Sequence, residues 1–369
     1  RRRNDATRSL GFGNYYLMEL ELQELDEGRL FRILDELKEL SDPAFRALRA
    51  EMDTGLAERF GVDPEELRPW HWEDFFGQEA PSVSTVDLDG FFQGLDLEGT
   101  AAGFFHGIGL PVDDVLARSD LYERDGKDQH AFCIDIDREG DVRTLCNLRP
   151  NEKWMSTLLH EMGHAAYDKF IPSGLPFLLR TPAHTLSTES IAMFMGRLTR
   201  DPEWLREVVG AELGAAEAAD IRRQLRAAML VSARWILVMV YFERELYRDP
   251  DWPDLNGLWW DLVERIQFIR RPEGRDEPDW GAKIHFSTAP VYYHNDLLGE
   301  LMASQLHSFL HRDVMRGRKG SIKGVAEVGT FLRDRIFAPG ASLDWNELLV
   351  HATGEELNPR HFVDQFVED

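Results

Sequence analysis

Apolar side chains recur at three- and four-residue spacing along most of this chain, which is the pattern of helices that bury one face. Between residues 14 and 60, Leu and Phe occur in this way among charged residues, as in LFRILDELKEL. Within that stretch, SDPAF at residues 41–45 predicts that one helix ends and another begins. Ser41 or Asp42 would be the cap of the second helix, with Pro43 in its first turn.

The same spacing predicts further helices over about 153–170, 187–198, 203–248, 254–270, 290–315 and most of the last 30 residues. Ser187 or Thr188 would lie near the cap of the second of these helices, and Pro290 would begin the fifth. Residues 77–99 and 270–281 carry Gly, Pro and polar side chains and predict loops. The fold class is therefore predicted to be mainly α.

One segment, FCIDIDREGDVRTLCNL at residues 132–148, alternates between apolar and polar positions and predicts an antiparallel β-hairpin. A two-residue turn at Glu139–Gly140 would place Cys133 directly opposite Cys146, at a pair of positions where side chains lie close. A disulfide is geometrically allowed there. Two reduced thiols are the alternative, which we favour for a cytoplasmic protein.

Composition and charge narrow the class of protein. The chain has 369 residues, 43% of them hydrophobic, and a formal net charge of −24, which excludes a nucleic-acid partner because phosphate binding needs a basic surface. The longest apolar stretch, residues 227–242, is interrupted by Arg234 and is short for a bilayer span, so we expect a buried helix and no membrane partner.

The first residues, RRRNDATRSL, contain no apolar stretch typical of a signal peptide. We therefore expect a cytoplasmic protein, or a secreted one if a signal peptide was removed upstream of Arg1. The sequence leaves the oligomeric state open.

The candidate chemistry begins at LLHEMGHAAYD, residues 158–168. On a helix, His160 and His164 lie one turn apart on the same face, so both can direct a ring nitrogen at one Zn²⁺ ion, with Glu161 beside a water on that ion. A third ligand has to come from another element. Glu189, 25 residues after His164, is our choice, and His184 is the alternative.

Several stretches resemble one family. HEMGH followed by a glutamate on the next helix is the arrangement of the gluzincin peptidases. QHAF at 129–132, GAKIHF at 281–286 and FAPGASLDWNELLVHATGEELNP at 337–359 resemble the angiotensin-converting-enzyme-like peptidyl-dipeptidases, with the thimet-oligopeptidase-like enzymes as more distant relatives. The resemblance implies one catalytic region over residues 1–369, a large multi-helix zincin-type domain with a deep cleft and a small hairpin at the cleft edge. The lid helices of the family would precede Arg1.

The resemblance also implies roles for individual residues. Zinc would be bound by His160, His164 and Glu189, and Glu161 would act as general base. His285 and a tyrosine, either Tyr293 or Tyr292, would stabilise the oxyanion. Lys283 would bind the C-terminal carboxylate of the substrate. At the cleft edge, the backbone at His130 and Ala131 would pair with an extended peptide, and His130 could bond to a substrate carbonyl.

Three positions depart from the family pattern. Asp296 stands where a tyrosine would complete the oxyanion site, so either Tyr293 or Tyr292 serves instead or the protein is impaired. Met193 stands where relatives often have an aspartate that orients a zinc histidine. The glutamine that assists the family's lysine has no clear match, because the aligned position holds Trp70.

The leading prediction is a zinc peptidase that acts on small peptides and releases dipeptides from their C-terminus. One alternative is an endo-acting oligopeptidase of the thimet or oligopeptidase F type. The other is a non-catalytic relative that binds zinc or peptides.

Overall fold

The computed structural model describes residues 1–72, 74–81 and 86–367. Its contacts divide the chain into two compact units. Unit 1 comprises Arg1–Val83, Gln224–Leu297 and Val363–Asp369, and unit 2 comprises Ser84–Arg223 and Leu298–Phe362. Three helices run from one unit into the other: α10 (Ala215–Arg248), α13 (His294–Phe309) and α16 (Arg360–Phe366).

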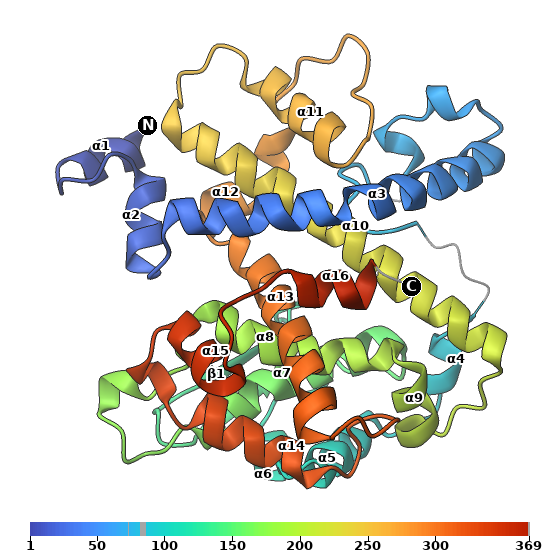
Figure 1. The fold of residues 1–369 in the computed structure, drawn as a ribbon, viewed down its shortest axis with the longest axis vertical. Helices are drawn as coiled ribbons and strands as arrows, with labels where there is room; N and C mark the ends of the chain where they lie inside the picture. The colour runs from blue at the N-terminus through green and yellow to red at the C-terminus, as the bar shows by residue number, and fades with distance from the viewer. Residues whose placement is uncertain (73, 82–85, 368–369) are drawn as a thin grey trace. The chain divides into compact units, whose positions relative to one another are not determined.

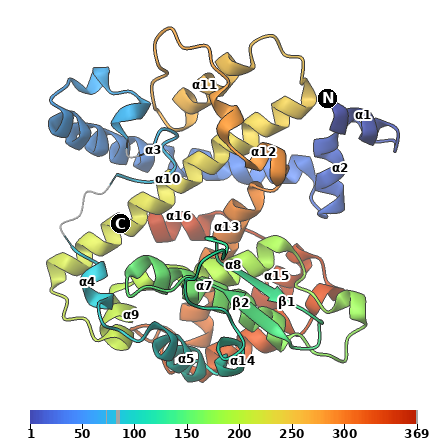
Figure 2. The same ribbon diagram turned by 180° about the vertical axis from the view of Figure 1, so that it is seen from behind.

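The remaining described helices of unit 1 are α1 (Arg2–Arg8), α2 (Tyr15–Leu22), α3 (Glu27–Phe60), α11 (Leu255–Ile266) and α12 (His285–Thr288). Figures 1 and 2 show α3 crossing α10. The core of this unit is aromatic, since Trp235, Phe242 and Trp259 are almost fully buried and their rings meet edge to face.

Helix α3 is continuous across Pro43, so the predicted break at residues 41–45 is wrong. Proline removes a backbone donor and normally ends or bends a helix. Side chains bond to the helical turn just before the proline. The Ser41 hydroxyl donates to the Leu37 carbonyl at 2.6 Å, and the buried guanidinium of Arg234 donates to Ser41 and to the Lys38 carbonyl and forms an ion pair with Asp42.

The single helix predicted over 203–248 is interrupted in the structure. Asp201 caps α9 (Pro202–Trp204), a π-helical turn follows, and Gly210 then takes φ of 79°, which ends the helical path. Helix α10 begins only at Ala215. By length and composition alone it could span a membrane, but most of its apolar stretch is buried within the structure, as in the core helices of globular proteins.

Unit 2 is built around the neighbouring helices α7 (Glu152–Phe170) and α8 (Thr185–Gly196). The other described α-helices that lie wholly in this unit are short: α4 (Asp89–Phe92), α5 (Leu97–Gly107), α6 (Asp113–Leu116), α9, α14 (Ala326–Phe331) and α15 (Trp345–Thr353). Glycines let α7 and α8 approach closely. A Cβ at Gly163 would lie 2.7 Å from the Ala192 Cα, and one at Gly196 would lie 3.3 Å from the His160 Cβ.

The hairpin forms, but in a different register from the predicted one. Strands β1 (Phe132–Asp135) and β2 (Val142–Leu145) pair Cys133 with Thr144, and both Cys133 and Cys146 are free thiols. The turn is longer than two residues because the Asp137 carboxylate accepts from the backbone N–H groups of Glu139 and Asp141. Opposition of Cys133 and Cys146 was therefore a wrong prediction.

Helix boundaries differ in two further places. Helix α8 is capped by His184, whose Nδ1 accepts from the Leu186 N–H at 3.0 Å, and not by Ser187 or Thr188. Helix α13 begins at His294 because Val291 takes φ of 55°, which a helix starting at Pro290 could not contain. The fold class itself is confirmed: the described residues are mainly helical, with one two-stranded antiparallel sheet.

Candidate metal centre

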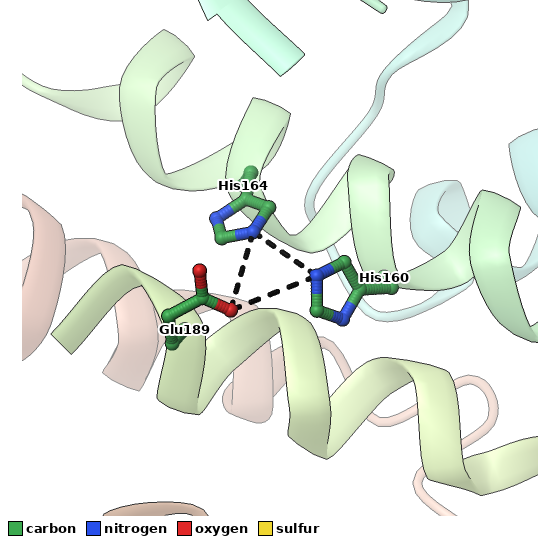
Figure 3. Close-up of side chains that lie close together, drawn as sticks. All are labelled: His160, His164 and Glu189. Carbon is green, nitrogen blue, oxygen red and sulfur yellow. Dashed lines mark hydrogen bonds and ion pairs between the residues drawn. The ribbon is translucent and has the colours of Figure 1, made fainter. Parts of the chain in front are cut away.

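Helices α7 and α8 bring three ligand atoms of unit 2 together (Figure 3). Nε2 of His160 and Nε2 of His164 are 3.2 Å apart, and each lies 3.7 Å from Oε2 of Glu189. Atoms with these separations lie on a circle of radius about 2.1 Å, and zinc bonds to nitrogen and oxygen are about 2.0–2.2 Å long. The three residues therefore fit a zinc ion without rearrangement.

Both histidines are set up to offer a lone pair. Desolvation by the surrounding protein lowers the pKa of His160 to about 4 and that of His164 to about 3, so both rings are neutral near pH 7. On the far side of the His164 ring, Nδ1 lies 2.7 Å from the hydroxyl oxygen of Thr188. Side chains of the triad keep 30%, 16% and 16% of their surface exposed, which leaves room for a further ligand.

Glu161 lies on α7 next to His160 and is buried. Its Oε2 atom has no hydrogen-bond partner among the described residues. Burial and then the charge of Glu189 raise the pKa of Glu161 to about 8. A carboxylate in such surroundings is a stronger base than one in water, which suits a group that takes a proton near neutral pH.

The other residues predicted in unit 2 lie apart from the triad's ligand atoms. His184, the alternative third ligand, caps α8 through the same ring that could have bound a metal. His130 and Ala131 precede β1, and the His130 ring is exposed beside Asp128, with 3.3 Å between Nδ1 and the carboxylate. In the described part of the chain, the triad is the one group of three such side chains close enough to hold a metal.

Unit 1 carries the second predicted cluster, around Lys283. Its ammonium donates to Oε1 of Gln78 at 3.0 Å and lies over the rings of Phe76 and Trp235, at 4.7 and 4.8 Å from their centroids. Burial lowers the pKa of Lys283, although the charge of Asp74 opposes this. The cation is thus held by an amide oxygen and two aromatic faces, and among the described residues no carboxylate is in hydrogen-bond contact with it.

Sequence reasoning missed Gln78 because it lies in a loop with no periodic pattern. The loop is held in place by the Asp74 carboxylate, which accepts from the N–H groups of Phe76 and Gln78. Gly77 takes φ of 59° between them, and the Gln267 amide donates to its carbonyl at 2.8 Å. Trp70, at the position aligned with the family glutamine, is 58% exposed and contacts His71.

Tyr293 also belongs to this cluster. Its hydroxyl oxygen accepts from the Trp235 indole N–H at 2.8 Å, so its own hydrogen remains available to donate, and its ring lies 4.5 Å from the His285 ring. Burial raises the pKa of Tyr293 to about 12. Tyr292 is partly buried next to it, and Asp296 follows in the first turn of α13, where its charge helps raise the Tyr293 pKa. Which of Tyr292 and Tyr293 would stabilise the oxyanion stays a prediction.

Two histidines and one carboxylate around an open position are the ligand set of catalytic zinc sites in peptidases such as thermolysin. The helical fold and this triad therefore define a helical protein with a candidate metal centre of this ligand type.

Comparison with known proteins narrows the class. The family model Peptidase_M2, described as angiotensin-converting enzyme, matches residues 91–366. Angiotensin-converting enzyme of Rattus norvegicus is 23% identical over 397 residues, which cover 96% of this chain and 29% of the rat protein. The chain thus spans less than a third of that relative's length. It belongs to the angiotensin-converting enzyme family, a family of zinc-dependent peptidases.

Proposed function

We propose that this chain hydrolyses small peptides with a zinc ion bound by His160, His164 and Glu189, and that it releases dipeptides from the C-terminus. The observation that carries the proposal is the triad, whose three ligand atoms lie about 2.1 Å from a common point. Zinc bound there would act as a Lewis acid on a water molecule and on the scissile carbonyl.

Glu161 would take a proton from the attacking water and pass it to the leaving amine. Its buried position beside His160 and the raised pKa support this role, because a proton must be accepted and released near neutral pH. His285 and one tyrosine would donate hydrogen bonds to the oxyanion. Tyr293 is our first choice because its hydroxyl hydrogen is not used by Trp235.

Release of dipeptides, as opposed to internal cleavage, would depend on Lys283 and Gln78. An ammonium and an amide N–H can bind the free carboxylate at a peptide's end. Holding that carboxylate fixes which bond is cleaved by its distance from the C-terminus. The contact between Lys283 and Gln78, with Phe76 and Trp235 around the ammonium, supports a carboxylate-binding role.

The test combines a metal assay with turnover of an internally quenched peptide. We expect about one zinc per chain, and Glu161→Gln should keep that zinc and lose turnover. A protein that binds zinc stoichiometrically but hydrolyses no peptide would support a non-catalytic relative instead.

A second measurement separates the two catalytic alternatives. A peptide with an amidated C-terminus should be cleaved poorly compared with the same peptide bearing a free carboxylate. Equal cleavage of both would favour the endo-acting oligopeptidase.

A further inference from the structure

The hydroxyl of Thr188 lies 2.7 Å from Nδ1 of His164, the ring nitrogen that faces away from the metal centre. Thr188 directly precedes the ligand Glu189 on α8. One short segment of that helix therefore supplies a ligand atom and also contacts the back of a histidine on α7. Neither the HEMGH pattern nor the position of Met193 predicted this contact.

A neutral imidazole carries a single N–H, on either Nδ1 or Nε2. It can bind a metal through Nε2 only when the proton is on Nδ1, and a hydrogen-bond acceptor next to Nδ1 favours that tautomer. The Thr188 hydroxyl oxygen lies at ordinary hydrogen-bond length from Nδ1 and can accept from an N–H there. In this arrangement the Nε2 lone pair points to the common point between His160 and Glu189 (Figure 3).

We propose that Thr188 is a positioning residue that holds His164 in its metal-binding tautomer and ring orientation. This inference rests on the proposed zinc site. Carboxylates often serve this purpose for metal-bound histidines, and Met193 cannot accept a hydrogen bond in the same way. A hydroxyl differs from a carboxylate because it orients the ring without adding negative charge to the site.

The packing of α7 on α8 explains how a side chain as short as threonine can reach. Gly163 lies against the Ala192 backbone and Gly196 against the Ser156 carbonyl and His160, so the two helices are close along the whole contact. The Ser156 hydroxyl also donates to the Gly196 carbonyl at 2.9 Å. With the helices this close, a threonine hydroxyl meets a ring on the neighbouring helix directly.

The decisive substitutions are Thr188→Val, which keeps the shape and removes the hydroxyl, and Thr188→Ser, which keeps the hydroxyl. Thr185→Val, an exposed threonine in the first turn of the same helix, is the matched control. Zinc affinity would be measured by competition with a chromogenic chelator on the full chain. We expect Thr188→Val to weaken zinc binding about 10–100-fold, and Thr188→Ser and Thr185→Val to stay within about threefold of the parent.

A second readout needs no metal. In the metal-free protein, ¹⁵N chemical shifts of the His164 ring report its tautomer. The parent should show the proton on Nδ1, and Thr188→Val should shift the population towards the Nε2–H form. Equal zinc affinity of the parent and Thr188→Val, or identical His164 tautomers in both, would overturn the inference.

The two readouts also separate this inference from the proposed function. If the parent bound no zinc, the proposed function would fail, and the tautomer measurement would still decide what Thr188 does to His164. If Thr188→Val failed to fold, the comparison of Thr188→Ser with Thr188→Ala would replace it, with weaker zinc binding expected only for Thr188→Ala.

Discussion

The candidate site of unit 2 gathers groups that can bind a cation, whereas the cluster of unit 1 is built around a cation. In unit 2, two neutral imidazoles and a carboxylate converge on one point, next to a second buried carboxylate, Glu161. In unit 1, the ammonium of Lys283 lies among aromatic rings and donates to an amide oxygen, its one hydrogen-bond partner among the described residues. The first site gathers ligands for a cation, and the second presents a cation that no described carboxylate contacts by a hydrogen bond.

This difference indicates what kind of ligand each site could bind. A carboxylate placed against Lys283 would neutralise the ammonium and occupy the position of a substrate carboxylate. A lysine placed against Glu189 would compete with a metal in the same way. Aromatic faces and an amide hold an ammonium while leaving its charge unneutralised. Each site can therefore be tested by changing one of its charges and measuring the binding that the charge would support.

The largest effect is expected for Glu189→Gln. The substitution keeps the shape of the side chain but removes the charge that binds Zn²⁺, so zinc affinity should fall at least about 100-fold. Chelator competition measures this directly. Exposed Glu347→Gln, also in unit 2, is the control and should bind zinc like the parent. Zinc binding within threefold of the parent would remove Glu189 from the ligand set.

The next largest effect concerns Glu243, which holds the segment that carries the tyrosines of unit 1. Its Oε1 accepts from the N–H of Val291, the residue with φ of 55°, at 2.8 Å, and the Gln23 amide donates to the Val291 carbonyl. Burial raises the pKa of Glu243 to about 7. The stability that follows from this raised pKa is fully present below the usual glutamate value and is lost as pH rises through 7.

Glu243→Gln keeps an acceptor for Val291 and cannot ionise. Between pH 4.5 and 8 the parent should therefore lose about 2–3 kcal/mol more unfolding free energy than the variant, measured as the shift in urea midpoint at each pH. Exposed Glu58→Gln is the control and should follow the parent. Parallel pH curves for the parent and Glu243→Gln would show that the pKa of Glu243 is not raised by burial, which would contradict this prediction.

Much of the metal triad could be predicted from sequence because its geometry is local. His160 and His164 are one helical turn apart by spacing alone, and Glu189 belongs to the next helix along the chain. The companion contact to Thr188 could not be predicted, because it depends on how closely α7 and α8 pack. That distance is set by Gly163 and Gly196, whose importance appears only when the facing backbone is known.

The errors fall where side-chain contacts, both local and between distant segments, decide the structure. Arg234, from another helix, bonds to Ser41 and to the Lys38 carbonyl in the turn before Pro43, where the sequence predicted a break. Gln78 could not be found because its loop has no periodic pattern. Its position depends on the Asp74 carboxylate, which accepts from the Gln78 N–H, and on the Gln267 amide, which donates to the Gly77 carbonyl. The hairpin was predictable from alternation, but its register was not, because Asp137 builds a longer turn with its own side chain.

A third prediction tests the closeness of α7 and α8. A Cβ added at Gly163 would lie 2.7 Å from the Ala192 Cα, which is backbone and cannot move aside alone. Gly163→Ala should therefore lower the unfolding free energy by about 1–3 kcal/mol and weaken zinc binding, since the helices must separate. Gly103→Ala in α5 meets nothing within 4 Å and should leave zinc binding unchanged, with equal or higher stability. Equal stability of the two variants would mean that the helix spacing is not set by Gly163.

The smallest expected effect is the most selective one. Lys283→Met keeps the length of the side chain among Phe76 and Trp235 and removes only the charge. A charge-assisted hydrogen bond contributes about 1.5–2 kcal/mol, so KM for a peptide with a free C-terminus should rise about 10–30-fold. Its zinc affinity should stay at the parental value, and so should its activity on the amidated peptide, because no carboxylate is left to bind. Exposed Lys153→Met controls for the loss of a positive charge anywhere on the chain. If Lys283→Met slowed cleavage of the free and amidated peptides equally, the ammonium would be acting on the fold of unit 1 and not on a substrate carboxylate. The anion-binding role of unit 1 would then be rejected, and only the proposed cation-binding site of unit 2 would remain.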